Sequence, residues 1–170
     1  DVNAARTLVN ALPASAEKTA LNNRLDAVQS GIDLAAKIAT ATQAVVKAEG
    51  TKTQADVDSA RTLVNALPNG TDKTNLTNRL NAIQTEIDAK AQLENLKENA
   101  TSAVETAETT KKQVDVDTAR TLVNQLPDGS FKDSLKVRLD AVQSAIDLAA
   151  KVNAATQAVV KAEGSKAQAD

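Results

Sequence analysis

The sequence lacks the residue types on which most enzymes and metal sites depend. Its 170 residues include no histidine, cysteine, methionine, tryptophan or tyrosine, and a single phenylalanine, Phe131. Without cysteine no disulfide can form, and without histidine neither a Ser–His–Asp nor a Cys–His nucleophile system can be built. Imidazole and thiolate metal sites are excluded for the same reason. We therefore expect no enzyme activity and no catalytic residue.

An excess of one charge and long apolar runs are also missing. Lysine and arginine number 20 against 22 aspartate and glutamate residues, and the two signs are interspersed. Nucleic-acid binding usually needs clustered cations with stacking aromatics, so we expect no nucleic-acid partner. No apolar run approaches the roughly 20 residues of a membrane-spanning helix, so we expect no membrane insertion. The five glycines are scattered and form no phosphate-binding loop, and we expect no cofactor.

What the sequence does contain is one segment written three times. Copies begin at Asp1, Asp56 and Asp115, and each keeps Ala-Arg-Thr-Leu-Val-Asn and a closing Leu-Pro. A period in this range indicates a repeat array in which each copy is one supersecondary unit. We assign repeats to 1–55, 56–114 and 115–170. Because the first residue is not methionine and Asp170 would begin a fourth copy, we expect the chain to be part of a longer protein.

Each repeat begins with a predicted short helix, at 53–67 in the second copy. One stripe of this helix is apolar, and Pro68 ends it: the stripe consists of Val57, Ala60, Val64 and Leu67. Capping boxes are predicted at its start and at the equivalent positions, with the N-cap at Thr51, Thr110 or Ser165 and glutamine three residues later. Gly50 and Gly164 precede two of these boxes, where a preceding helix would place its left-handed C-terminal residue.

A long helix follows, with predicted N-caps at Ser15, Thr71 and Ser130. Its apolar positions alternate steps of four and three, which predicts a heptad seam. In copy one the seam is Leu21, Leu25, Val28, Ile32, Ala35, Ala39, Thr42 and Val46. In copy three it is Leu135, Leu139, Val142, Ile146, Ala149, Asn153, Thr156 and Val160.

This long helix is expected to be continuous. Gly31 is the one candidate for a break, and its equivalents, Glu86 and Ala145, are good helix formers. The four additional residues of the middle copy fall after Asp88, where a helix would accept them as a stutter. The alternative is three self-contained bundles, 1–49, 56–108 and 115–163, with breaks near Gly31, Asp88 and Ala145.

The expected fold is all-α, a tandem series of spectrin-like three-helix bundles with the long helices shared between adjacent bundles. The short helix would lie antiparallel to the second half of the preceding long helix and to the first half of the following one. The bundles are then out of phase with the repeats, at about 33–89 and 90–147. The expected partners of each repeat are the neighbouring repeats of the same chain.

Several polar groups could suggest a site. Asp56, Asp58, Asp115 and Asp117 resemble calcium ligands, but no twelve-residue loop follows, and acidic residues in the first turn of a helix suit its dipole. We therefore expect no metal site. Glu105 and Glu108 are interpreted as a solvated helix face. Phe131, with Glu17 and Asp72 at the equivalent positions, is interpreted as a cover over its helix start, and a binding anchor is the alternative.

Six polar positions recur in every copy. They are Arg6/Arg61/Arg120, Asn10/Asn65/Asn124, Lys18/Lys73/Lys132, Arg24/Arg79/Arg138, Gln29/Gln84/Gln143 and Asp33/Asp88/Asp147. A ligand site written once per repeat would have this form. So would structural bridges, which we favour: Arg24 and Asp33 could tie helices together, and Asn65 could satisfy carbonyls at the end of the short helix.

The pattern Val-Asp-x-Ala-Arg-x-Leu-Val-Asn-Ala-Leu-Pro, followed by Lys73-Thr-x-Leu76-x-x-Arg79-Leu80, resembles known repeats. It is similar to the tandem helical repeats of Gram-positive cell-surface and S-layer-associated proteins, including the FIVAR-type modules. The resemblance covers all copies. It implies an extracellular, wall-attached location and a structural stalk or spacer, with adhesion or catalysis elsewhere in the parent protein.

Two functions remain open at this point. The first is a non-catalytic stalk or spacer repeat of a secreted or wall-attached bacterial surface protein, which repetition and helical continuity favour. The second is a helical-bundle binding module, similar to an adhesin, that holds a host or cell-wall protein through an exposed apolar patch.

Overall fold

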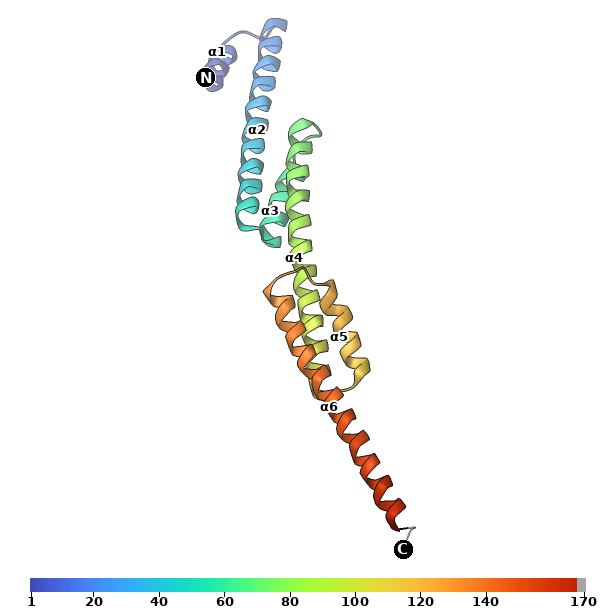
Figure 1. Ribbon diagram of the computed structural model, residues 1–170. Coiled ribbons are helices and arrows are strands. Elements are labelled where there is room, and N and C mark those ends of the chain that lie inside the picture. The colour runs from blue at the N-terminus through green and yellow to red at the C-terminus, as the bar shows by residue number, and fades with distance from the viewer. Residues whose placement is uncertain (168–170) are drawn as a thin grey trace. The chain divides into compact units, whose positions relative to one another are not determined.

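The computed structural model describes residues 1–167, and within that range the chain is entirely α-helical, with no β-strand. Figure 1 shows its helices. They are α1 (Val2–Asn10), α2 (Ala16–Thr51), α3 (Gln54–Asn65), α4 (Thr71–Thr110), α5 (Gln113–Gln125) and α6 (Ser130–Ala167). The all-α prediction is confirmed. Contacts divide the chain into two units, Asp1–Ala89 and Lys90–Asp170. Their arrangement as a tandem series of spectrin-like bundles stays a prediction.

The short helices α1, α3 and α5 form where a polar cap precedes an apolar stripe. The side chain of Thr53 accepts a hydrogen bond from the backbone N–H of Asp56, and Asp1 accepts one from the backbone N–H of Asn3. The stripe of α3 is buried as predicted, at Val57, Ala60 and Val64. All three short helices end two or three residues before a proline, which lacks the N–H that a further helical turn would need.

The long helices are continuous. Gly31 lies inside α2 and Ala145 inside α6, and α4 runs unbroken past Asp88. The alternative with breaks at these three positions is therefore wrong. A helix accepts the four additional residues of the middle copy because four residues add little more than one turn.

The helix junctions differ from the prediction. Gly50 and Thr51 belong to α2, and the left-handed residue after the helix is Lys52, with φ 50°. The capping box at Thr51 is therefore wrong, and Thr53 caps α3 instead. The left-handed conformation therefore falls on a lysine, where it costs roughly 1–2 kcal/mol.

The capping box at Thr110 is wrong as well, and the one at Ser165 reaches Gln168, which lies outside the described residues. Lys111, with φ 51°, takes the left-handed position after α4, and Lys112 precedes α5 without a side-chain cap. Ser165 and Gly164 lie within α6, where the Ser165 hydroxyl donates to the Lys161 carbonyl.

The starts of the long helices match the prediction within one residue. The Ser15 side chain caps α2 by accepting from the Lys18 N–H, as predicted. Thr71 and Ser130, predicted as caps, are instead the first helical residues of α4 and α6. The preceding glycine carbonyls accept the first helical hydrogen bonds there.

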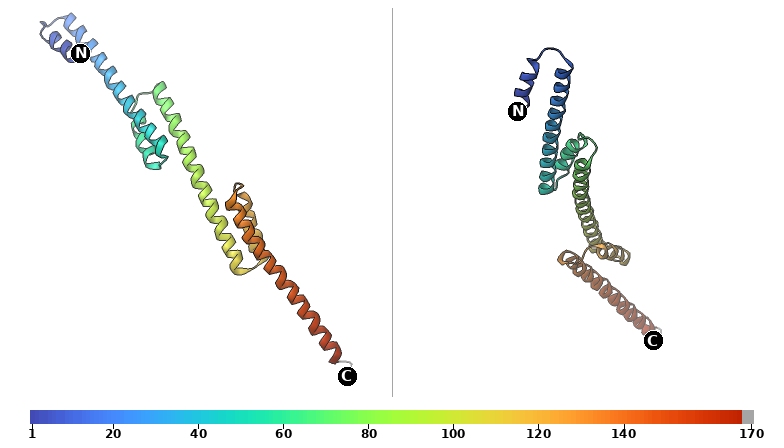
Figure 2. Two further views of the ribbon diagram at one scale, coloured as in Figure 1. Left: turned by 60° about the vertical axis from the view of Figure 1, so that its left-hand side comes forward. Right: turned by 90° about the horizontal axis from the view of Figure 1, so that it is seen from above.

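The first unit contains one buried cluster to which α2, α3 and α4 contribute. Figures 1 and 2 show α3 against the last turns of α2 and beside the first half of α4. The cluster consists of Ala41, Val45 and Ala48 from α2, Val57, Ala60 and Val64 from α3, then Leu67, and Leu76, Leu80 and Ile83 from α4. The cluster combines small residues on α2 with longer ones on α4, so that side chains of different size fill the interior.

The second unit repeats this packing with α4, α5 and α6. Its cluster consists of Ala100, Val104 and Ala107 from α4, Val116, Ala119 and Val123 from α5, then Leu126, and Leu135, Leu139 and Val142 from α6. Valine and leucine are the largest fully buried side chains in both clusters. Neither cluster holds an aromatic residue.

The predicted heptad seam is buried only in the first half of α6. In the first half of α2, Leu21 and Leu25 are half-buried, and Val28 and Ile32 are 52% and 50% exposed. Leu135, Leu139 and Val142 are buried, but Val46 and Val160 are 54% and 61% exposed. Ala39, Ala149, Asn153 and Thr156 are exposed, and Thr42 is half-buried. In α2 the buried row runs through Ala41, Val45 and Ala48 instead. The second half of α2 packs with α3 and α4, and so it uses a different face from the first half. No residue after Ile146 in α6 belongs to the buried cluster of the second unit.

None of the described helices combines the length with the apolar character that crossing a bilayer requires.

Helix continuity can be tested at Gly31. An added Cβ there meets no atom within 4 Å, and the residue lies in mid-helix. We expect Gly31→Ala to raise the free energy of unfolding by about 0.5–1 kcal/mol, because glycine loses more backbone entropy than alanine. Urea unfolding followed by circular dichroism measures this.

Gly129→Ala is the matched control. Gly129 also has open space around it, but its φ of +153° is unfavourable for any side chain, so the same substitution should destabilise the chain by about 1–3 kcal/mol. Destabilisation by Gly31→Ala would contradict a continuous α2.

Candidate functional site

The six recurring polar positions were the candidates for a site. In the described structure five of them use their side chains in contacts between or within helices, and at the asparagine position the backbone carbonyl takes part. Lysine forms the most regular of these contacts. The Nζ of Lys73 donates to the backbone carbonyls of Asn65 and Leu67, both at 2.9 Å. Lys18 and Lys132 make the same two bonds, at 2.7–3.1 Å, in their own copies.

This lysine satisfies carbonyls that the short helix leaves without a partner at its C-terminus. A cation there also suits the negative end of the helix dipole. The backbone oxygen of Asn65, rather than its side chain, takes part, which corrects the predicted role of this residue. Lys132 is 9% exposed, and its third bond goes to the carboxylate of Asp128.

Arginine joins two long helices in each unit. Arg79 of α4 forms a bidentate pair with Glu49 of α2, both N···O distances being 2.8 Å. Arg138 of α6 does the same with Glu108 of α4, at 2.8 and 2.7 Å. The prediction that the Arg24 position ties helices together is right for its equivalents Arg79 and Arg138, each of which pairs with a glutamate thirty residues earlier. The Asp33 position forms no such tie, because the aspartate accepts from a glutamine of its own helix in every copy. Interpreting Glu108 as only solvated is also wrong.

These pairs fix the ionisation of the carboxylates. The hydrogen bonds from Arg79 lower the pKa of Glu49, and those from Arg138 lower the pKa of Glu108. Both groups stay ionised well below neutral pH. A general acid working near neutrality needs a pKa shifted in the opposite direction.

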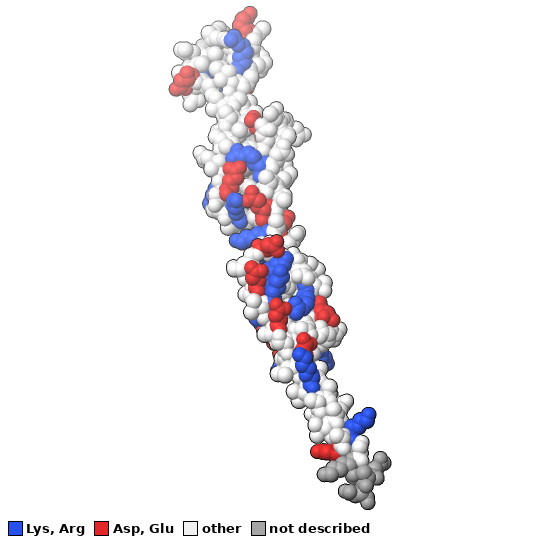
Figure 3. Space-filling model, in the orientation of Figure 1, with Lys and Arg blue, Asp and Glu red and all other residues white. Residues whose placement is uncertain are grey.

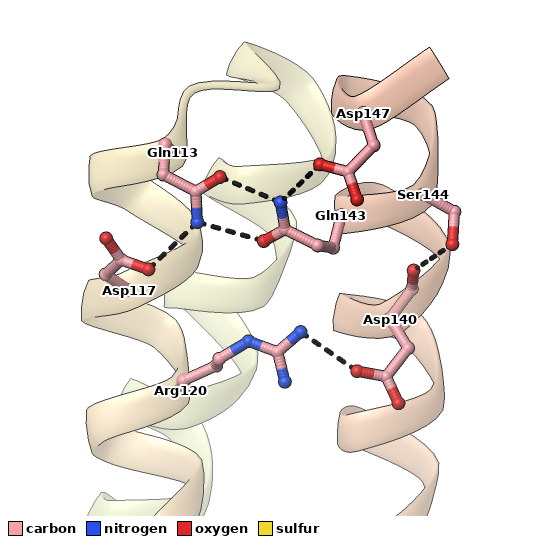
Figure 4. A network of polar contacts seen from close by, with 7 residues as sticks. All are labelled: Gln113, Asp117, Arg120, Asp140, Gln143, Ser144 and Asp147. Carbon is pink, nitrogen blue, oxygen red and sulfur yellow. Dashed lines mark hydrogen bonds and ion pairs between the residues drawn. The ribbon is translucent and has the colours of Figure 1, made fainter.

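A reciprocal amide pair connects the short helix to the following long helix. Figure 4 shows it in the second unit, where Gln113 and Gln143 each donate to the other's side-chain oxygen at 2.9 and 2.8 Å. Each amide also donates to a carboxylate one turn away on its own helix, Asp117 or Asp147. Gln54 and Gln84 form the same pair in the first unit, so Gln54 bonds across helices instead of completing a capping box.

A second bridge lies alongside the amide pair. Arg120 of α5 donates to Asp140 of α6 at 2.9 Å, as Figure 4 also shows. Arg61 donates to the amide oxygen of Asn81 at 3.2 Å in the same place, and Arg6 pairs with Asp26 at 2.9 Å. Because an amide replaces the carboxylate in the middle copy, the position needs an acceptor but not a charge.

The acidic residues that could suggest calcium have separate protein partners. Asp56 accepts from Lys47 of α2 at 2.7 Å, while Asp58 accepts from Gln54. The Lys47 ammonium, followed by the Thr51 and Thr53 hydroxyls, lowers the pKa of Asp56 from 3.8 to about 2. The expectation that these carboxylates hold no metal stays a prediction.

Phe131 is 41% exposed at the start of α6. The Nζ of Lys97 on α4 lies 5.7 Å from the centre of its ring, within range of a cation–π interaction. Beside the ring is an open hollow of about 470 Å³, lined mainly by charged and hydroxyl residues of α4. Both original interpretations of Phe131, as a cover and as an anchor, are compatible with this position.

Charges of both signs are mixed over the surface. On the face shown in Figure 3, lysine and arginine lie next to aspartate and glutamate over each unit. Most of the ion pairs recorded within residues 1–167 join neighbouring helices and are partly exposed, such as Arg6–Asp26 and Arg79–Glu49. Pairs of this kind contribute about 0–1 kcal/mol each, so they orient helices more than they stabilise them.

Sequence reasoning missed the partners of the recurring residues. The sequence analysis did not predict that Glu49 and Glu108 pair with arginines, or that Lys47 pairs with an aspartate. The signal that could have found the glutamates is the constant spacing of thirty residues, shared by Glu49–Arg79, Glu108–Arg138 and the two glutamine pairs.

The chain is similar to part of a bacterial protein. It is 42% identical over 144 residues to the minor extracellular protease Epr of Bacillus subtilis (strain 168). The match covers 85% of this chain and 20% of that protein, so the chain spans about a fifth of its relative's length. No family model and no solved structure matches the chain. The similarity relates the chain to part of an extracellular bacterial protein.

The low pKa of Asp56 leads to a testable dependence on pH. A carboxylate whose pKa is depressed by folding contributes stability above its unfolded pKa and loses it as the pH falls through the folded value. We expect Lys47→Met to raise the pKa of Asp56 from about 2 toward 3.8, as measured by NMR titration of its carboxyl carbon. The variant should unfold at lower urea concentration than the wild type above about pH 4, and the difference should vanish near pH 2.

Lys37→Met is the control, since Lys37 is an exposed lysine of the same helix. This variant should leave the titration of Asp56 unchanged. If the carboxyl of Asp56 titrates near 3.8 in the wild-type chain, the Lys47 contact does not form in solution.

Proposed function

We propose that this chain is a non-catalytic helical spacer within a secreted bacterial protein. The observation that carries the proposal is that five of the six recurring polar positions use their side chains in contacts between or within helices, so that repetition preserves packing. The glutamates of these contacts are held ionised and paired with arginine. The carboxylates beside the glutamine pairs accept hydrogen bonds from amides.

The similarity to Epr supports the extracellular part of the proposal. The relative is by its name an extracellular protease, and the match occupies a fifth of it. A Ser–His–Asp or Cys–His proteolytic centre cannot be built from this chain, which has no histidine. We therefore propose that the chain accompanies an activity located elsewhere in its parent protein.

The resemblance to Gram-positive surface repeats extends the proposal to the cell surface. Attachment to the wall or to an S-layer, and a role as an adhesin stalk, follow from that resemblance alone and stay predictions. Fractionation of the culture medium and the cell wall, with detection by an antibody to the repeats, tests them.

The spacer proposal predicts that length grows in equal steps with repeat number. Inserting a second copy of residues 56–114 should add about 44 Å to the maximum dimension, because the equivalent bridges at Arg79 and Glu108 lie 29 residues apart on the continuous helix α4, at about 1.5 Å per residue. Small-angle X-ray scattering of the two proteins measures the increment. An insertion that increases the mass with no such increase in maximum dimension would contradict the proposal.

A binding module is the second candidate, and Phe131 favours it. It is the single aromatic residue of the chain, it is exposed beside a hollow, and a lysine holds one face of its ring. Aromatic residues of this kind often anchor protein–protein interfaces.

If Phe131 anchors a host or cell-wall protein, Phe131→Ala should weaken capture of that protein by at least about tenfold, since interface anchors contribute 2 kcal/mol or more. Pull-downs from serum and from cell-wall extract measure this. Val137→Ala, which truncates an exposed apolar residue of the same helix, is the control. Equal capture by both variants would contradict an anchor at Phe131.

A further inference from the structure

The turn between α3 and α4 holds the one asparagine–glycine pair of the sequence, Asn69-Gly70. Both residues are exposed and lie outside the helices. Among residues 1–167 neither the side-chain amide of Asn69 nor the backbone N–H of Gly70 has a hydrogen-bond partner. A Cβ built on Gly70 would meet no atom within 4 Å. No contact in the described structure therefore holds the amide and the following N–H in place.

An asparagine in this setting can react with its own backbone. The nitrogen of the next residue attacks the side-chain carbonyl carbon and forms a new C–N bond, while the proton of that nitrogen and the side-chain NH2 leave together as ammonia. The product is a succinimide ring, which water opens to aspartate or, at the other carbonyl, to isoaspartate. Glycine favours the attack because it has no Cβ to hinder the approaching nitrogen.

Asparagines inside a helix are protected from this reaction. Asn75 and Asn78 lie within α4, where each N–H that follows them bonds to a carbonyl four residues earlier. The attacking nitrogen is occupied there, so ring closure would first require the helix to open. Asn69 precedes the helix and has no such protection.

The third repeat shows what an aspartate at this position contacts. Asp128 is the equivalent of Asn69, and its carboxylate accepts a hydrogen bond from the Nζ of Lys132 at 3.0 Å. Lys132 thereby has three partners, the other two being carbonyls at the end of α5. Lys73, the equivalent of Lys132, bonds to the two carbonyls alone among the described residues. A carboxylate in place of the Asn69 amide would supply the missing third partner.

Aspartate is also the less reactive residue at this position. The hydrogen bond from Lys132 lowers the pKa of Asp128, so its carboxylate stays ionised. An ionised carboxylate resists attack by a backbone nitrogen. The contact with the lysine therefore protects the aspartate from the ring closure that is open to the asparagine.

We propose that Asn69 is a site of spontaneous deamidation, and that its aspartate product gives Lys73 the third partner that Lys132 has in Asp128. Each event consumes one water, releases one ammonia and replaces a neutral amide with a carboxylate just before α4. A negative charge there suits the positive end of the helix dipole. Isoaspartate, the other product, adds a methylene to the backbone of the turn and places its carboxylate differently. The inference is independent of the proposed function as a spacer.

Peptide mapping by mass spectrometry, after incubation of the folded chain at mildly alkaline pH, measures the reaction. Asn69 should convert to aspartate and isoaspartate much faster than Asn75 or Asn78, which are controls within the same chain. Gly70→Ala should slow the conversion severalfold, because a Cβ hinders the attacking nitrogen, and the open space around Gly70 should leave the helical content unchanged. Equal rates at Asn69 and Asn75, or equal rates in the wild-type chain and Gly70→Ala, would overturn the site.

The contact with Lys73 is tested separately with Asn69→Asp, which represents the aspartate product. This variant should unfold at a higher urea concentration than the wild type at neutral pH, and the gain should be lost in a Lys73→Met background. Asp128→Asn removes the equivalent contact of the third repeat and should lower the urea midpoint. A gain of the same size with and without Lys73 would assign it to the helix dipole and overturn the proposed third partner.

NMR titration provides a second measurement that does not require Lys73→Met to fold. In Asn69→Asp the introduced carboxyl should titrate below the usual pKa of aspartate, as the hydrogen bond from Lys132 makes Asp128 do. A carboxyl that titrates at the usual pKa of an unpaired aspartate would also overturn the contact with Lys73.

Discussion

The structure depends on burying one apolar stripe of a short helix between two long ones. A helix of about twelve residues is marginal in water, so α3 forms because Val57, Ala60 and Val64 are covered on both sides. Each fully buried valine or leucine contributes about 1.5–3 kcal/mol, and neither a disulfide nor an aromatic core supplements them. Within the described part of the chain, the equivalent stripe of α1 packs against α2 alone, and its residues Val2 and Ala5 are more exposed than Val57 and Ala60 of α3.

The polar contacts follow from this burial. Reversal of the chain at the short helix brings a residue near the end of one long helix opposite a residue thirty positions later in the next. Glu49 and Arg79 meet in this way, as do Gln113 and Gln143 on the short and long helices. The lysine that caps the short helix also depends on the reversal, because its carbonyl partners lie six and eight residues earlier. One packing arrangement therefore determines three kinds of polar contact.

The sequence was sufficient to predict the helices and the buried stripe of the short ones, because prolines and apolar periodicity are local signals. The sequence did not predict which face of the second half of the long helices is buried. Alanine occurs on several faces of the helix there, so the heptad pattern could include Ala39 as easily as Ala41. Ala41 is the one that is buried, because it packs in the cluster with α3. The residue with the left-handed backbone could not be predicted locally either. Glycine is the usual residue after a helix, which favoured Gly50, but α2 continues through Gly50 and the left-handed residue is Lys52. The polar partners required knowledge of the chain reversal.

Comparing the three copies distinguishes residues that hold the helices together from residues that could bind a partner. Lys73, Arg79 and Gln84 recur in every copy, and where their contacts are complete they lie between helices. Phe131 occupies an exposed position that is glutamate in one copy and aspartate in another. A ligand site repeated along the array would place its identical polar residues on the outside. The recurring lysine, arginine and glutamine side chains bond to neighbouring helices, so repetition preserves how the helices join. Recognition by this chain would have to rest on features of single copies such as Phe131.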